Sequence, residues 1–202
     1  MKTAILTDSN SGIFPEEGER LGIFVLPMPV ILDGKEYFEG VNLTPNEFYQ
    51  HIAEGADVST SQPSPGDVIS MFDRIFSEGY DELVYIPMSS GLSSSYQTAQ
   101  MLSEEYEERA QIVDNHRISV TLHDSVLYAK SLADQGIRAK EIRVALEATA
   151  MDSMIYLGVN TLKYLKKNGR CTPTVATLGD VLNIKPLLIC QGGRFDRCCL
   201  PR

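Results

Sequence analysis

Basic residues are scarce in this chain of 202 residues: 18 lysines and arginines stand against 27 aspartates and glutamates, and the formal net charge is −9. Proteins that bind nucleic acids or adhere to anionic membranes need clustered positive charge. The acidic balance argues against both classes of partner. The sequence also lacks an apolar run of the length that spans a bilayer, so we expect no stable membrane insertion. The first ten residues, MKTAILTDSN, predict a first strand rather than a signal peptide, which favours a cytoplasmic location.

Cysteine and histidine are too few and too poorly spaced for a metal site. The four cysteines, Cys171, Cys190, Cys198 and Cys199, form no CxxC pair, and no histidine lies at ligand spacing from them. We therefore expect free thiols, and neither a metal ion nor a cofactor. The segment GLSSSY lacks the lysine of a nucleotide-binding P-loop, and the chain lacks the GxSxG pattern of many serine hydrolases.

Apolar runs that predict strands alternate with amphipathic stretches that predict helices. Strands are expected within 2–7, 81–88, 110–115, 153–160 and 184–196, and helices within 44–55, 64–80, 118–136, 139–151, 161–170 and 172–183, with a further helix from about residue 93. Pro27 and Pro29 exclude a helix over 22–34 and disfavour a central strand. The alternation predicts an α/β fold with a Rossmann-like, mostly parallel sheet and flanking helices. We place an N-terminal α/β domain at residues 1–152 and the start of a second, smaller α/β domain at residues 153–202.

Three loops rich in hydroxyl groups stand where expected strands end or expected helices begin: TDSNSG (7–12), STSQPSPGD (59–67) and PMSSGLSSSY (87–96). Ligands of open α/β sheets gather where strands end and helices begin, and a helix N-terminus with serine donors can hold a carboxylate or a phosphate. Serine and threonine also cap helices routinely, so each loop taken alone has a structural explanation. Asp8 fits a ligand-binding role or a turn residue equally well, and Arg170 is either an anion-binding charge or a favourable charge at a helix C-terminus.

Taken together, these loops and the segment LKYLKKNGR (162–170) resemble the DegV family. The resemblance implies a bacterial fatty-acid-binding protein of two α/β domains with the lipid between them. It implies a non-catalytic carrier that presents the bound carboxylate to a separate fatty-acid kinase. Carried onto this sequence, the carboxylate ligands are Thr60, Ser61 and Ser93, with Ser94 as a neighbour and Arg170 beside the head group or on the partner surface.

Family members are longer than this chain, and the resemblance ends near residue 196. The second domain is therefore expected to be truncated, without a late, histidine-containing segment that also faces the head group. Two alternatives to a carrier stay open. One is a hydrolase or phosphotransferase that uses a serine of the 90–95 loop as nucleophile, which requires a base within hydrogen-bond reach. The other is an inert or regulatory remnant produced by truncation.

Overall fold

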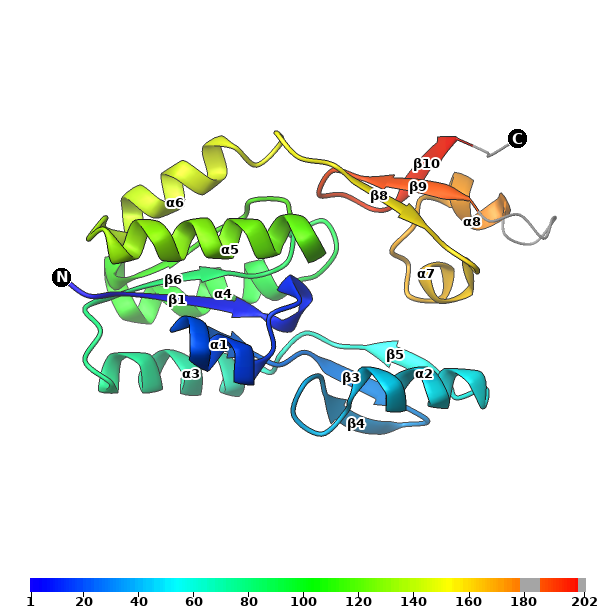
Figure 1. The fold of residues 1–202 in the computed structure, drawn as a ribbon, viewed down its shortest axis with the longest axis horizontal. Coiled ribbons are helices and arrows are strands. Elements are labelled where there is room, and N and C mark those ends of the chain that lie inside the picture. The colour runs from blue at the N-terminus through cyan, green and yellow to red at the C-terminus, as the bar shows by residue number, and fades with distance from the viewer. Residues whose placement is uncertain (179–185, 200–202) are drawn as a thin grey trace.

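The computed structural model describes residues 1–178 and 186–199, and a parallel sheet of four strands, in the order β2-β1-β6-β7, forms the middle layer of its left-hand part in Figure 1. Its strands are β1 (Thr3–Asp8), β2 (Phe24–Leu26), β6 (Glu82–Ile86) and β7 (Ala110–Ile112). The chain passes from β1 to β2 on one side and returns to place β6 on the other. The carboxyl ends of β1 and β6 therefore flank a topological switch point, where open α/β sheets bind ligands.

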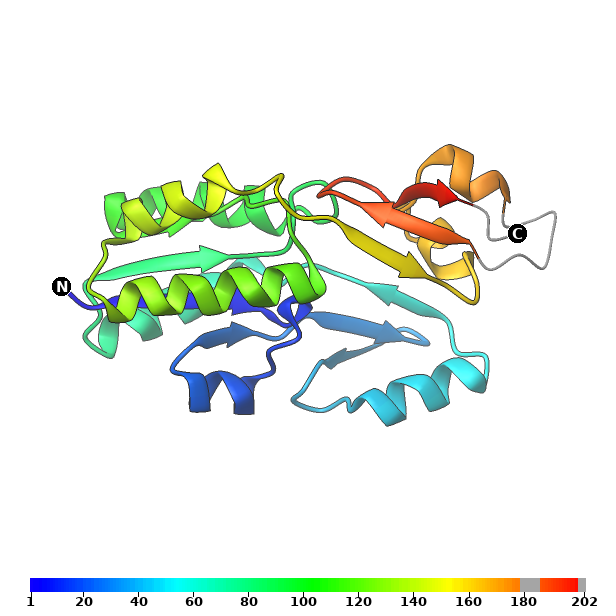
Figure 2. The same ribbon diagram turned by 45° about the horizontal axis from the view of Figure 1, so that its top comes forward.

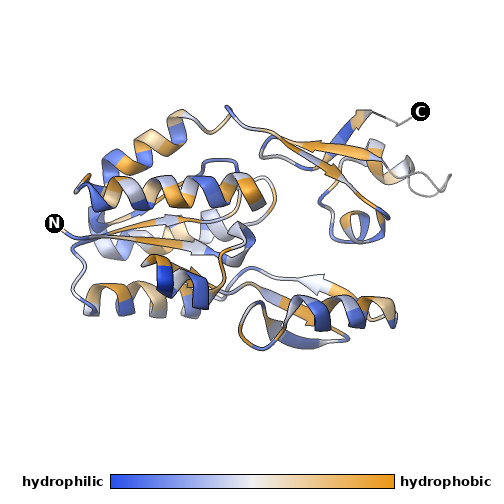
Figure 3. Cartoon of the chain, in the orientation of Figure 1, coloured by the Kyte–Doolittle hydropathy of each residue, from blue (hydrophilic) through white to orange (hydrophobic). Residues whose placement is uncertain are grey.

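Helices cover both faces of this sheet, because successive strand residues point to opposite sides. Ile5 packs on α5 (Ser119–Asp134) and α6 (Ala139–Ala148), whereas its neighbours Ala4 and Leu6 pack on the side of α3 (Pro65–Ser77) and α4 (Ser95–Ser103). Figure 3 shows the hydrophobic colour along the central strands and mixed colours along the helices. The predicted α/β class is confirmed.

A second, antiparallel sheet extends the first lobe beyond the carboxyl end of β1. It has the order β4-β3-β5, with β3 (Pro29–Leu32), β4 (Lys35–Phe38) and β5 (Val58–Thr60), and it carries α2 (Pro45–Ala53). The prediction that Pro29 disfavours a central strand was wrong, since β3 is central here. Pro29 is tolerated because it is the first residue of the strand, where its carbonyl accepts from Ser61 N at 3.2 Å.

The remaining elements form a separate small lobe (Figure 2). Its antiparallel sheet has the order β10-β9-β8, with β8 (Ile155–Gly158), β9 (Leu187–Cys190) and β10 (Asp196–Cys199). Two short helices, α7 (Lys163–Lys167) and α8 (Pro173–Leu178), accompany it. We call β8–β10, α7 and α8 the second lobe, and the elements from β1 to α6 the first lobe. The predicted boundary at residue 152 falls in the turn between α6 and β8, and the division into two domains stays a prediction.

Most expected elements are present with shorter bounds. The helix expected at 64–80 begins after a Ser64 capping box with Asp67, and Gly79 follows its end with a positive φ of 86°. The helix expected at 172–183 is described only to Leu178, and its remainder lies outside the described residues. Within the described ranges, no helix has the length and apolar content needed to cross a membrane. Cys171 and Cys190 are buried and form no disulfide there.

Several short elements were not predicted. They are α1 (Pro15–Leu21), β5, β10 and the 3-10 turns at Ser9–Ser11 and Glu104–Arg109. Helix α1 has no apolar stripe because it packs through a glycine: a Cβ at Gly18 would lie 2.6 Å from the carbonyl oxygen of Ile23. Such a contact leaves no hydrophobic periodicity to detect.

Candidate functional site

The loop after β1 is organised by a buried carboxylate. Asp8 accepts hydrogen bonds from Asn10 N at 3.0 Å, from Asn10 Nδ2 at 3.0 Å and, across the switch point, from Met88 N at 2.9 Å. Burial raises the pKa of the Asp8 carboxyl from 3.8 to about 6, and the bonds from Met88 and Asn10 oppose that rise. Asp8 thus fixes the geometry of two loops, which favours the turn-residue interpretation of this position.

The loop after β6 is folded around Ser89. The carbonyl oxygen of Ser89 accepts from Leu92 N at 3.0 Å and from Ser93 N at 3.2 Å, and its hydroxyl accepts from Gly91 N at 3.2 Å. Ser93 Oγ then accepts from Ser95 N at 3.2 Å and lies 2.8 Å from Ser95 Oγ. Capping is therefore part of the role of these serines. Ser93 also lines a cavity. A hydroxyl oxygen can accept from the helix while its hydrogen donates elsewhere.

The third loop leads from β5 into α3. Thr60 ends β5, and Ser61 Oγ donates to Gln62 O at 3.0 Å. Further along, Ser64 caps α3, with Asp67 N donating to its hydroxyl at 3.1 Å. Thr60 Oγ1 has no hydrogen-bond partner among the described residues. The capping explanation therefore accounts for Ser64 and leaves the Thr60 hydroxyl available to a ligand.

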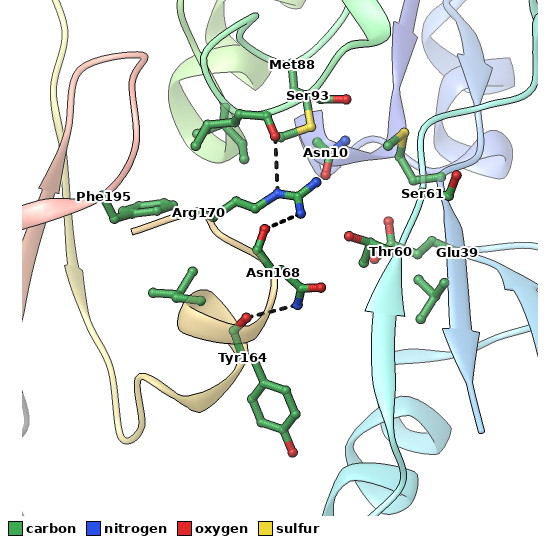
Figure 4. A pocket seen from close by; sticks show the side chains of 15 residues that line it. Asn10, Glu39, Thr60, Ser61, Met88, Ser93, Tyr164, Asn168, Arg170 and Phe195 are labelled. Carbon is green, nitrogen blue, oxygen red and sulfur yellow. Dashed lines mark hydrogen bonds between the residues drawn. The ribbon is translucent and has the colours of Figure 1, made fainter. Parts of the chain in front are cut away.

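Arg170 comes from the second lobe, just after α7. Its Nε donates to the carbonyl of Leu92 in the first lobe at 3.3 Å, and its Nη1 donates to the carbonyl of Asn168. A guanidinium has five N–H donors. Among residues 1–178 and 186–199, Nη2 has no acceptor and no carboxylate pairs with the side chain. Figure 4 shows this guanidinium between the β5 side of the first lobe and the Ser93 loop.

These elements enclose a cavity of about 240 Å³ between the two lobes. Its polar lining is Asn10, Glu39, Thr60, Ser61, Ser93, Asn168 and Arg170, and its other lining residues are Met28, Val30, Met88, Leu92, Ile118, Tyr164, Leu165 and Phe195. Polar groups converge on one part of a largely apolar pocket, which is the usual build of a small-molecule site. The positive guanidinium and the hydroxyl donors suit an anionic group attached to an apolar body.

The structure brings together four of the five residues that the sequence singled out. Thr60, Ser61, Ser93 and Arg170 all line the cavity, although Arg170 is separated by more than 70 residues from the other three. Ser94 does not line it: this residue is exposed at the start of α4 and makes no side-chain cap bond. Their role as ligands of a carboxylate stays a proposal.

Three further polar residues of the cavity were not predicted: Asn10, Glu39 and Asn168. Asn10 and Asn168 fall inside the segments TDSNSG and LKKNGR, so those motifs carried a signal. Glu39 carried none, since it follows β4 and reaches the cavity only through the pairing of β3 with β4. Its Oε2 accepts from Ser9 Oγ at 2.7 Å.

The site defines a class of protein: a two-lobed α/β protein with a cavity between the lobes that is lined by an arginine, hydroxyl groups and one carboxylate, that of Glu39. The chain belongs to the DegV family, whose family model, described as "Uncharacterised protein, DegV family", matches residues 2–199. The chain is 34% identical over 197 residues to a DegV domain-containing protein of Deinococcus radiodurans, covering 97% of this chain and 70% of that protein. It is 31% identical over 195 residues to one of Staphylococcus aureus, covering 96% of this chain and 70% of that protein.

Solved structures agree in fold. A DegV family protein from Thermus thermophilus, described by its fatty acid binding, superposes with a TM-score of 0.88 at 33% identity, covering 100% of this chain and 72% of that one. A fatty acid binding DegV family protein from Streptococcus agalactiae superposes with a TM-score of 0.86 at 29% identity, covering 100% and 72%. The family resemblance inferred from the loops is confirmed.

Proposed function

We propose that this chain binds a long-chain fatty acid, with the carboxylate held in the cavity between the lobes. One observation carries the proposal: Thr60, Ser61, Ser93 and Arg170 converge on a cavity whose other lining is mostly apolar. The fatty acid binding described for the relatives from Thermus thermophilus and Streptococcus agalactiae supports it.

The energetics of a buried carboxylate suit these groups. A desolvated carboxylate is costly unless donors replace its water, and each bond to a charged group contributes about 1.5–3 kcal/mol. Ser93 and Thr60 supply neutral donors, and the Arg170 guanidinium supplies charge. Each buried methylene adds about 0.8 kcal/mol. The cavity, about 240 Å³, is small beside the roughly 300–1,000 Å³ of drug-sized pockets. The cavity therefore has room for the head group and the first methylenes of the fatty acid. The rest of the acyl tail requires the apolar side chains around the cavity to move apart.

The test compares palmitate with hexadecanol, which has the same chain length and no charge, on the delipidated protein. Because the donors recognise a carboxylate, palmitate should bind at least about tenfold more tightly than hexadecanol, the equivalent of one charge-assisted bond. Equal affinities for the two ligands would contradict the proposed head-group site.

We further propose that the chain is a carrier that presents its bound carboxylate to a separate fatty-acid kinase. The family resemblance supports this, and so do the donors, which can hold one carboxylate oxygen and leave the other to react. The test incubates the palmitate-loaded chain with ATP and Mg²⁺, with and without a bacterial fatty-acid kinase, and traps acyl phosphate with hydroxylamine. Product is expected only when the kinase is present, and product formed by the chain alone would contradict the carrier role.

The residues that the structure describes offer no histidine base for the alternative of a serine nucleophile. A nucleophilic serine needs a base within about 2.6–3.2 Å. Across the described parts of the chain, no histidine hydrogen-bonds a serine of the 90–95 loop. His116, for example, faces a carboxylate, with its Nδ1 3.7 Å from Asp114 Oδ1. Incubation with a serine-reactive phosphonate followed by mass spectrometry should give no adduct on this loop, and an adduct there would favour the enzyme.

A further inference from the structure

The two lobes touch backbone to backbone at a point that lines no part of the cavity. The turn 191–194, between β9 and β10, lies against the start of the loop after β6. The Ser89 hydroxyl donates to the carbonyl of Gly192. A Cβ at Gly91 would clash with that same oxygen and would lie 3.0 Å from Gly193 Cα, a tighter contact than most side-chain carbons make. We call the meeting of Ser89 and Gly91 with Gly192 the interlobe contact.

On its other side, the turn 191–194 lies equally close to His116 in the loop after β7. Gly192 has a positive φ of 86°, and a Cβ there would lie 2.3 Å from His116 Cβ and 2.7 Å from the carbonyl oxygen of His116. Gly192 is therefore enclosed between the loop after β6 and the loop after β7. A turn of the second lobe can enter this space only because neither Gly91 nor Gly192 has a side chain.

The interlobe contact shares its residues with the proposed head-group site. Ser89 holds the turn that carries Ser93, through hydrogen bonds from Leu92 N and Ser93 N to its carbonyl. The carbonyl of Leu92, in the same turn, accepts from Arg170 of the second lobe. One short turn therefore fixes Ser93 within the first lobe and sets how closely Arg170 approaches it.

We propose that Ser89 and Gly91 are positioning residues for ligand binding. The interlobe contact sets the separation between the Ser93 hydroxyl and the Arg170 guanidinium, and so sets the affinity for the carboxylate without touching it. Small displacements of binding groups have large effects, since a misplacement of about 1 Å can cost about 100-fold in a positioned site. The effect on the ligand rests on the proposed function. The interlobe contact itself rests only on the geometry of the two lobes.

Two glycines provide a matched pair of variants. Gly91→Ala drives a methyl group into the backbone of the second lobe, while Gly91 has no positive φ that alanine would strain. Gly193→Ala, in the opposing turn, adds the same methyl group with nothing within 4 Å and also without a positive φ. The first variant separates the lobes, and the second controls for the change of glycine to alanine. Ser89→Ala, which removes only the hydroxyl, is the milder second variant in case Gly91→Ala does not fold.

The first readout needs no ligand. Hydrogen exchange of the delipidated chain should be faster for peptides spanning 88–94 and 190–195 in Gly91→Ala, and unchanged from the natural sequence in Gly193→Ala. Equal exchange in the two variants would overturn the proposed contact. Because no fatty acid is present, this result is independent of the proposed function.

The second readout separates positioning from general stability. Gly91→Ala should weaken palmitate binding by at least about tenfold and reduce the preference for palmitate over hexadecanol, because the carboxylate donors have moved apart. Gly193→Ala should keep the palmitate affinity and the preference for palmitate over hexadecanol of the natural sequence. An unchanged palmitate preference in Gly91→Ala would overturn the positioning role. If the natural sequence itself shows no binding, the proposed function fails, and hydrogen exchange alone decides the interlobe contact.

Discussion

Replacing Ser93 with alanine tests the head-group site at a single oxygen. In the unliganded protein, Ser93 Oγ contacts Ser95 Oγ at 2.8 Å and accepts from Ser95 N at 3.2 Å. In the proposed complex, the Ser93 hydroxyl hydrogen donates to the carboxylate while the oxygen still accepts from Ser95. Ser93→Ala removes the donor to the ligand and also the acceptor that caps the start of α4.

The two losses have different magnitudes and different assays. A bond to a charged group contributes about 1.5–3 kcal/mol, so the dissociation constant for palmitate should rise about 10- to 150-fold in calorimetric titration. The lost neutral cap contributes about 0.5–1.5 kcal/mol to folding, a decrease of a few degrees in the melting temperature for a chain of this size. The affinity should therefore fall by more than the stability.

Ser94→Ala is the matched control, since Ser94 is the next residue, is exposed and does not line the cavity. It should bind palmitate as the natural sequence does. If Ser93→Ala keeps full affinity for palmitate, or if Ser94→Ala loses as much, the reasoning about this site is refuted.

Three further predictions concern charge, pH and packing. Arg170→Met should weaken palmitate binding more than hexadecanol binding, and Arg170→Lys should restore part of the difference; equal losses for both ligands in Arg170→Met would contradict a carboxylate contact. Relative to Asp8→Asn, the natural sequence should gain unfolding free energy as the pH falls from about 6 to about 4, because the folded Asp8 carboxyl, with its pKa raised to about 6, binds the proton more tightly than the unfolded one. Urea titrations at several pH values measure this, and a pH-independent difference contradicts it. Phe72 is fully buried and packs edge-on against Tyr85 at 6.1 Å between ring centroids. Phe72→Ala should therefore cost about 3–5 kcal/mol of unfolding free energy, and a loss below about 1 kcal/mol would show that this core is not tightly packed.

The elements that were predicted well from the sequence are those with local signals, such as capping residues and periodic apolar positions. Helix α3 has Ser64 and Pro65 at its start and apolar residues at helical spacing, and α2 begins in the same way with Thr44 and Pro45. Helix α1, by contrast, packs through Gly18 and carries no such signal. The pairing of β3 with β5 was also not predictable, since Val58–Thr60 follows β3 only after β4 and α2, and no local pattern specifies that contact.

The sequence motifs of the candidate site could be predicted, but the spatial arrangement of their side chains could not. Successive residues at the start of a helix point about 100° apart, so a run of serines does not reveal which one faces a ligand. Ser93 lines the cavity and Ser94 does not. Glu39 enters through the pairing of β4 with β3, and the meeting of Gly91 with Gly192 depends on how two lobes dock. Such features arise from tertiary contacts between residues far apart in the chain.

The most direct test of the central claim is native mass spectrometry of this 202-residue chain purified from a bacterial host, followed by denaturation and analysis of released lipid. We predict one fatty acid per chain, lost on unfolding, with occupancy reduced in Ser93→Ala and retained in Ser94→Ala. A chain that stays empty after incubation with palmitate, or that holds fatty acid equally in both variants, would contradict a carboxylate site in the cavity between the lobes.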